Sequence, residues 1–387
     1  MTEAGKLRRS VYLVNFLYSL QFGLLLYFNS SFLLDLGFSG QAIGLIFAAG
    51  YALAIAVLLL IPRLLPRFGN RSLFTTGLLI AGAIFFAIST STSQLSVALL
   101  LPVALAISTS MHVLIDVFLQ TASADKNKVG VRRGLMSSLT NGAYIASQSL
   151  VILLLARGPF SLLYAATAVL IVPLAVLSYL LFRRFRDPAY ERPKWGGVLG
   201  KLRVSKDLRN IFFIQFLLRL FYSIMVVYTP IYLHEYVGLS LPDMGVVFAV
   251  MLLPFVLFEV LIGRLEDTRW GEQEVLVSGF VVIGVATAAL AFFSIPHVAL
   301  WAAALFATRV GAVLIDVGSE AYFFKHVMGS NAGEVSSFRM LYPFAYIIGP
   351  LAAAALLFVI PLKLLFVVLG VVMLLGIFPA LALRDTR

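Results

Sequence analysis

Val113-Leu114-Ile115-Asp116-Val117 recurs without a change as Val313-Leu314-Ile315-Asp316-Val317, 200 residues later. Shorter matches accompany this pentapeptide at offsets of 199 to 202 residues: Phe16-Leu17 with Phe216-Leu217, Ser137-Ser138 with Ser336-Ser337, and Ala143-Tyr144-Ile145 with Ala345-Tyr346-Ile347. One such match could arise by chance in so apolar a chain, but several at nearly one offset indicate an internal duplication. The sequence therefore predicts two similar halves.

The composition indicates that lipid surrounds most of the chain. Of the 387 residues, 61% are hydrophobic and 12% are charged, whereas a soluble domain carries about 25% charged residues. A helix crosses the hydrocarbon core with about 20 mainly apolar residues. Twelve stretches meet this requirement: 10–34, 41–61, 72–92, 95–118, 133–156, 160–183, 209–234, 242–264, 273–294, 297–320, 334–359 and 362–383. We expect an all-α membrane protein of twelve transmembrane helices in two six-helix, pseudo-symmetric bundles.

The formal net charge of +11 reflects topology. Basic residues gather on one side of the predicted helices, and the loops on the other side contain only Arg157 and Lys363. The positive-inside rule then places both termini in the cytoplasm, so the charge does not require a nucleic-acid partner. We expect six-helix bundles at residues 1–183 and 209–387, joined by a basic cytoplasmic linker at residues 184–208. The absence of cysteine excludes disulfides and thiolate metal sites.

A loop between the eighth and ninth predicted helices carries a recognisable motif. Its sequence, Gly263-Arg264-Leu265-Glu266-Asp267-Thr268-Arg269-Trp270-Gly271, resembles the glycine, acid and basic pattern of the major facilitator superfamily. It departs by one extra residue and by Thr268, where a basic residue is usual. The first-half copy, Pro62–Arg71, keeps the arginines but has Pro66 in place of the aspartate. Together with the helix number and the basic linker, this makes the whole chain similar to that superfamily.

The resemblance implies a cytoplasmic gate made of acids and arginines. In the superfamily, an acid near the cytoplasmic end of the fourth or tenth helix pairs with loop arginines and holds the inner gate closed. Carried over, Asp116 would pair with Arg67 or Arg71, and Asp316 with Arg264 or Arg269. A carboxylate at membrane depth is costly unless it is paired, which favours an arginine partner on physical grounds too. The expected gate residues are Asp116, Asp316, Arg67, Arg71, Gly263, Arg264, Asp267 and Arg269.

Two arginines are candidates for a substrate site. Arg219 lies in the predicted seventh helix and Arg309 near the middle of the tenth, and the resemblance implies that helices 1, 4, 7 and 10 line a central cavity. An arginine at the bilayer centre costs about 2.5–3.5 kcal/mol. Both arginines must therefore either face a wet cavity or pair with acids, for which Glu259, Glu320 and Asp316 are available. The first reading gives a positive pocket for an anionic group, and the second gives structural ion pairs.

The first half offers neutral polar groups at the corresponding places. Ser19 and Thr109 stand where the second half has Arg219 and Arg309. We expect substrate contacts from neutral side chains of this half as well, namely Asn15, Gln21, Tyr27, Asn141 and Tyr144.

A coupling proton has two candidate carriers. Glu259, in the eighth helix, is the better one. His112, one turn before Asp116, could titrate near neutral pH, but it is better explained as a packing side chain. The antiporter signature of the superfamily, a glycine series ending in Gly-Pro on the fifth helix, is absent from Gly142–Gln148. This absence weakens the case for a drug–proton antiporter.

Other classes of protein are disfavoured. Four scattered histidines and no cysteine supply no catalytic or metal constellation, and there is no phosphate-binding loop for ATP. We expect no enzyme, metal or cofactor, but a monomeric secondary transporter in the plasma membrane, such as a bacterial inner membrane. It would move a small organic anion or amphipathic solute by alternating access, through a site between the halves, with protons as a candidate coupling ion. A transporter for a neutral sugar or nucleoside and a non-transporting receptor with the same fold are the alternatives.

Overall fold

The computed structural model of the protein describes residues 3–121, 129–188, 190, 205–259, 261–262, 271–326 and 332–383. Within these ranges all regular structure is helical, as the sequence predicts. The chain divides into two compact units, Met1–Ser39 with Ile46–Arg192 and Gly40–Leu45 with Pro193–Arg387.

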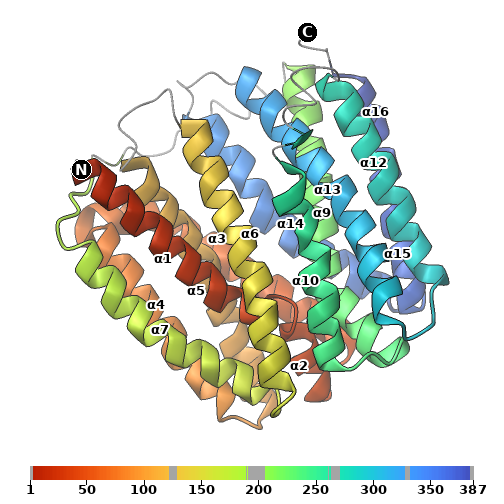
Figure 1. Ribbon diagram of the computed structural model, residues 1–387, viewed down its shortest axis with the longest axis horizontal. Helices are drawn as coiled ribbons and strands as arrows, with labels where there is room; N and C mark the ends of the chain where they lie inside the picture. The colour runs from red at the N-terminus through yellow and green to blue at the C-terminus, as the bar shows by residue number, and fades with distance from the viewer. Residues whose placement is uncertain are drawn as a thin grey trace. The chain divides into compact units, whose positions relative to one another are not determined.

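The first six predicted spans appear as seven helices, drawn from red to yellow-green in Figure 1. They are α1 (Glu3–Leu26), α2 (Asn29–Asp35), α3 (Gly40–Phe68), α4 (Asn70–Ser89), α5 (Gln94–Thr121), α6 (Val129–Leu155) and α7 (Ser161–Leu181). The first span is broken by a turn at Tyr27 and Phe28, so that α2 completes it.

In the last six predicted spans, α9 passes directly into a π-helical segment, and a short helix follows α15. The helices are α9 (Lys206–Ile231), α10 (Leu241–Leu257), α12 (Glu272–Ala289), α13 (Val298–His326), α14 (Ala332–Leu356), α15 (Leu362–Leu375) and α16 (Ile377–Leu381), with a π-turn η2 (Tyr232–Tyr236) after α9 and a 3₁₀ turn η3 (Leu290–Phe292) after α12. Eleven spans in the described ranges are long and apolar enough to cross a membrane, and α10 is a shorter apolar helix at the position of the eighth predicted span.

Several helix pairs are the same in the two units. In the first unit α1 packs on α5, α6 and α7, and α4 packs on α5 and α7. In the second unit α9 packs on α13, α14 and α15, and α12 packs on α13 and α15. These are the same pairs once each helix is matched to its counterpart in the other half, so the fold carries the duplication seen in the sequence.

One crossing shows the duplication at the level of single residues. Gly23 of α1 lies against Ser147 of α6, and Gly349 of α14 lies against Ser223 of α9. A Cβ atom added to either glycine would clash with the facing serine side chain. The glycine and the serine have therefore exchanged helices between the halves, while the close approach of the two backbones is kept.

The loop expected at Pro62–Arg71 is almost entirely helical, which corrects the predicted boundary. Helix α3 continues through Pro62 and Pro66 to Phe68, and α4 begins at Asn70. The connection consists of Gly69, whose φ of 75° lies in the left-handed region that glycine adopts without strain. The chain therefore turns at this single glycine, and neither proline ends the helix.

Candidate functional site

Two helices of the second unit present polar side chains to each other. On α9, Gln215, Arg219 and Tyr222 follow at spacings of four and three residues and therefore share one face. On α13, Arg309 and Asp316 are seven residues apart, two helical turns, and also share a face. The side chain of Ser205 accepts a hydrogen bond from the Leu208 amide and so caps the start of α9.

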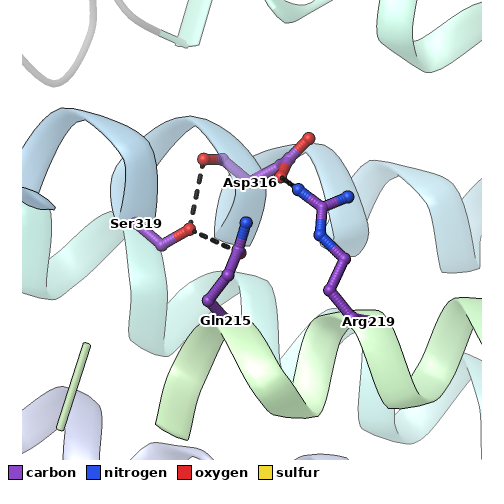
Figure 2. Close-up of polar contacts among 4 residues, drawn as sticks. All are labelled: Gln215, Arg219, Asp316 and Ser319. Carbon is purple, nitrogen blue, oxygen red and sulfur yellow. Dashed lines mark hydrogen bonds and ion pairs between the residues drawn. The ribbon is translucent and has the colours of Figure 1, made fainter. Parts of the chain in front are cut away.

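The face contains an ion pair, shown in Figure 2. Arg219 Nη2 lies 3.0 Å from Asp316 Oδ1, and the two side chains are 21% and 28% exposed. One turn away the Ser319 hydroxyl, 3.1 Å from Gln215 Oε1, donates a hydrogen bond across the same two helices. Partial exposure reduces the desolvation penalty that a fully buried pair would carry, so this pair can open without stranding either charge in a dry interior.

Arg309 differs from Arg219 because it is enclosed. Its side chain is 1% exposed, and its guanidinium carbon lies 5.0 Å from the ring centre of Phe221 and 5.5 Å from that of Tyr222. In the described part of the chain, Nη1 of Arg309 has no hydrogen-bond partner. Cation–π contacts contribute about 2 kcal/mol when desolvated, whereas an unsatisfied donor on a charged group costs about that much or more.

Tyr222 connects the two arginines. Its ring centre is 5.7 Å from the Arg219 guanidinium carbon and 5.5 Å from that of Arg309. The side chains Gln215, Arg219, Tyr222, Arg309, Asp316 and Ser319 form what we call the arginine cluster. These six side chains hold two arginines and one carboxylate, and Glu320 also lies within electrostatic reach of Arg219, so Arg309 is the cation that can accept an anionic group.

Neither Tyr222 nor the Gln215–Ser319 bond was predicted from the sequence. The 200-residue repeat could have identified Gln215 and Tyr222. Gln215 matches the candidate Asn15, and Tyr222 matches another aromatic residue, Phe22. Nothing in the repeat indicates Ser319, whose counterpart is Leu119.

The neutral candidates of the first unit lie in different surroundings. Asn15 is buried, and its Nδ2 donates to Thr140 Oγ1 at 2.9 Å, which ties α1 to α6. Gln21 is 2% exposed, and within the described ranges its Oε1 has no hydrogen-bond partner. Tyr27 is buried at the turn after α1, and Asn141 and Tyr144 are half-buried on α6.

His112 is packed among aromatic rings. Its ring centre is 5.0 Å from those of Tyr18 and Phe22, and both contacts are edge-to-face. Phe22 also approaches Tyr144, at 6.1 Å. The other candidate for a coupling proton, Glu259, is half-buried just beyond the end of α10.

The gate residues are described only in part. Arg71 lies over the ring of Tyr179, 4.0 Å from its centre, and Arg67 lies over the neighbouring Phe68. Asp116 is half-buried on α5, and its pairing with either arginine stays a prediction. Gly263, Arg264, Asp267 and Arg269 fall outside the described residues, so the pairing of Asp316 with Arg264 or Arg269 also stays a prediction.

The family model described as the Major Facilitator Superfamily matches residues 11–340 and, in a second match, residues 211–387. No curated protein sequence matches significantly.

Several solved structures have a similar fold. A point mutant of the nucleoside transporter NupG superposes with a TM-score of 0.78 at 16% identity, covering 97% of this chain and 99% of that one. NupG itself gives a TM-score of 0.75 at 16% identity over 97% and 98% of the two chains. A bacterial homologue of the human lysosomal transporter Spinster, inward-facing and unoccupied, gives 0.71 at 12% identity over 99% and 94%. At these identities the likeness shows the fold.

Proposed function

The chain belongs to the major facilitator superfamily, and we propose that it is a secondary transporter for a small organic anion or an anionic amphipathic molecule. Family and fold indicate an integral membrane transporter rather than an enzyme. The proposed mechanism is alternating access, in which the two halves expose the substrate site to one side of the membrane at a time. The proposed location is a cytoplasmic membrane such as the bacterial inner membrane, with both termini inside.

The observation that carries the proposal is the enclosed guanidinium of Arg309. A buried arginine that stacks on two rings still has a donor, Nη1, without a hydrogen-bond partner in the described part of the chain. Buried charged groups are stable when they are paired and hydrogen-bonded. A carboxylate or phosphate on the substrate would supply both the charge and the acceptor, and an arginine binds either group in a planar, two-point geometry.

Arg219 is the second cation of the proposed site. It forms an ion pair with Asp316 at 3.0 Å and lies within electrostatic reach of Glu320. We assign it a supporting role, in which the ion pair orients Arg219 beside Tyr222 and adjusts the charge that the substrate meets. The pairing of Arg219 is compatible with a gate function of Asp316, because a partly exposed pair can exchange partners.

A proton is the proposed coupling ion. Glu259 is the proposed carrier, because a half-buried carboxyl group near the end of a span can bind and release a proton as its exposure changes. His112 is the weaker candidate, since its aromatic surroundings already account for it as a packing side chain.

A neutral solute such as a nucleoside is the second candidate. Gln21 Oε1 and Gln148 Oε1 are buried acceptors without hydrogen-bond partners in the described ranges, and Phe22 and Tyr144 provide rings on which a base can stack. NupG, which has a similar fold, is a nucleoside transporter by its name. These groups need no charge on the substrate, and this property separates the two candidates.

The first experiment is a thermal-shift screen of the purified protein against carboxylates, phosphate esters, sugars and nucleosides at two pH values. A stabilising compound is then tested by counterflow in proteoliposomes, since a receptor binds its ligand without exchanging it. We expect an anion to stabilise the wild-type protein and to exchange. Stabilisation by nucleosides alone would favour the second candidate.

The second experiment replaces Arg309. Arg309→Gln should lower the affinity for the anion by about 100-fold, because truncating one partner of a buried charge pair costs roughly 2–5 kcal/mol. Arg309→Lys should keep part of the affinity, and Thr109→Gln, at the matching position of the first half, serves as the control. Unchanged uptake by folded Arg309→Gln protein would rule out the anion site.

A further inference from the structure

A basic cavity opens at one end of the first unit. Its volume is about 770 Å³, and it lies where α1 begins and where α5 and α7 end. Four of its lining residues are cations, Lys6 near the start of α1 and Arg183, Arg184 and Arg186 after α7. Its described lining contains no acidic side chain. This cavity lies outside the arginine cluster and has no part in the function proposed above.

The remaining lining of the cavity is apolar or carries hydroxyl groups. Leu7, Leu181 and Phe185 supply the apolar surface, and Ser10 and Thr121 supply the hydroxyls. A ligand that fits this lining carries a negative charge at one end and hydrocarbon at the other. A free inorganic anion would leave the apolar part uncovered.

The basic segment that follows α7, Phe182–Asp187, is fixed to the helices around it. Phe182 stacks on Phe118 with a ring-centre distance of 3.9 Å, and Phe185 meets the same ring edge-on at 4.7 Å. The arginines between and after these anchors are exposed. The anchored aromatic residues therefore fix the backbone that carries these cations before any ligand binds, which lowers the entropy lost on binding.

The end of the segment is held by Asp187. Its Oδ1 accepts a hydrogen bond from the backbone amide of Asn70 at 2.7 Å, at the start of α4, and another from the hydroxyl of Tyr190. Partial burial and this carboxylate raise the pKa of Tyr190 well above its usual range, so the phenol keeps its proton, and this hydrogen bond, to a higher pH than a free tyrosine would. Asp187 is thus engaged by the start of α4 and by Tyr190.

Stabilisation of a helix end explains only part of this arrangement. Cations after the last turn of α7 interact favourably with its carbonyl end. Lys6, however, lies near the amino end of α1, where a helix favours negative charge. Four like charges around one cavity repel one another unless an anion lies between them.

We propose that this cavity binds the phosphate-bearing headgroup of an anionic phospholipid. The four cations contact the phosphate, and Leu7, Leu181 and Phe185 contact the first carbons of the acyl chains. The ends of membrane-spanning helices lie at the depth of lipid headgroups, and basic pockets there suit anionic lipids. By the positive-inside rule this is the cytoplasmic leaflet.

The test uses the purified full-length protein in a neutral detergent and phosphatidylglycerol with a fluorescent tail. Unlabelled phosphatidylglycerol should displace the probe, whereas phosphatidylcholine and inorganic phosphate should not. Equal displacement by phosphatidylcholine would overturn the proposal because charge would not matter. Equal displacement by inorganic phosphate would overturn it because the site would take a soluble anion. Both outcomes are read on the wild-type protein and do not depend on any variant folding.

A matched pair of variants locates the site. Arg183→Gln/Arg184→Gln should weaken binding roughly 30-fold, since each cation near the surface contributes about 1 kcal/mol. Arg9→Gln/Arg63→Gln removes the same charge from exposed positions of the same unit that do not line the cavity, and it should bind within about twofold of wild type. Arg183→Lys/Arg184→Lys should retain most of the binding. Equal loss in the two Gln pairs would show that only net charge matters and would refute the assigned site.

Discussion

The first and fourth helices of each half contact each other in the same way, yet they bring together different chemistry. In the first half, α1 and α5 place His112 between Tyr18 and Phe22, with ring-centre distances of 5.0 Å to each. In the second half, α9 and α13 form the Arg219–Asp316 ion pair and enclose Arg309. The backbone arrangement is therefore common to both halves, and the charge belongs to one.

The comparison is clearest at matching positions. Thr109 corresponds to Arg309 and is 8% exposed, against 1% for the arginine. Phe22 corresponds to Tyr222, so each half keeps an aromatic ring at that place. The one-sided cation, on a duplicated scaffold with an aromatic ring at the same place in each half, is the difference on which the proposed anion site rests.

The largest effect is expected when an arginine is placed in the first half, at the position that matches Arg309. Thr109→Arg should destabilise the protein by about 3 kcal/mol, the cost of an arginine within a membrane span. The yield of monodisperse protein and its melting temperature in detergent should both fall. Thr109→Val, which removes the hydroxyl at nearly constant volume, is the control. A melting temperature equal to that of wild type would mean that the first half accommodates the charge as readily as the second.

The ion pair provides the second test. Removing one partner of a buried pair costs about 3–5 kcal/mol of stability. Because this pair is partly exposed, Asp316→Asn should lower the free energy of unfolding by about 2 kcal/mol, and its melting temperature should fall accordingly. Arg219→Gln should cost a similar amount. The double variant should be more stable than the sum of the single effects predicts, with a coupling energy of about 1–2 kcal/mol. Additive effects would show that the pair does not contribute to folding.

Much of the fold could be predicted from the sequence. The apolar spans and the pentapeptide at Asp116 and Asp316 led to twelve helices and two halves, and the loop motif at Gly263–Gly271, with the helix number and the linker, led to the family. The error at Pro62–Arg71 arose because the helix ends were set by the extent of the apolar spans and by the likeness to the family's loop, whereas α3 passes through Pro62 and Pro66 and turns at Gly69. In lipid, an unpaired backbone amide or carbonyl is costly, so the helical conformation is strongly favoured. A helix can therefore continue past a proline, which lacks an amide donor.

The arginine cluster was predictable as a set of residue types but not as a set of contacts. Charge at membrane depth identified Arg219, Arg309 and Asp316 as residues that need partners. The sequence could not decide between a cavity and an ion pair, because that choice depends on which faces of α9 and α13 meet. Only the three-dimensional arrangement pairs Arg219 with Asp316 and leaves Arg309 between Phe221 and Tyr222.

The aromatic cluster of the first half gives a smaller expected effect. His112→Phe retains a ring between Tyr18 and Phe22 and should change the unfolding free energy by less than about 1 kcal/mol. His112→Ala removes both edge contacts and should cost about 1–2 kcal/mol. Thermal unfolding at neutral pH measures both variants. If proton-driven uptake is lost in His112→Phe while exchange continues, the histidine carries the proton and its role is not packing.

The smallest effect concerns two matching amides that bond to different helices. Asn15 of α1 donates to Thr140 on α6 at 2.9 Å, whereas Gln215 of α9 accepts from Ser319 on α13 at 3.1 Å. Hydrogen bonds between membrane helices contribute about 0.6 kcal/mol on average, so Asn15→Ala and Gln215→Ala should each lower stability by about that amount.

Double-mutant cycles with Thr140→Val and Ser319→Ala isolate these two bonds from the loss of side-chain volume. Similar coupling energies in the two cycles would mean that the halves depend equally on neutral hydrogen bonds, so that their difference lies in the ion pair and in Arg309. A coupling in the Asn15–Thr140 cycle as large as that of Arg219 with Asp316 would contradict this view. The amide of the first half would then contribute as much to folding as the charge pair of the second, and the asymmetry of charge would no longer distinguish a site from its scaffold.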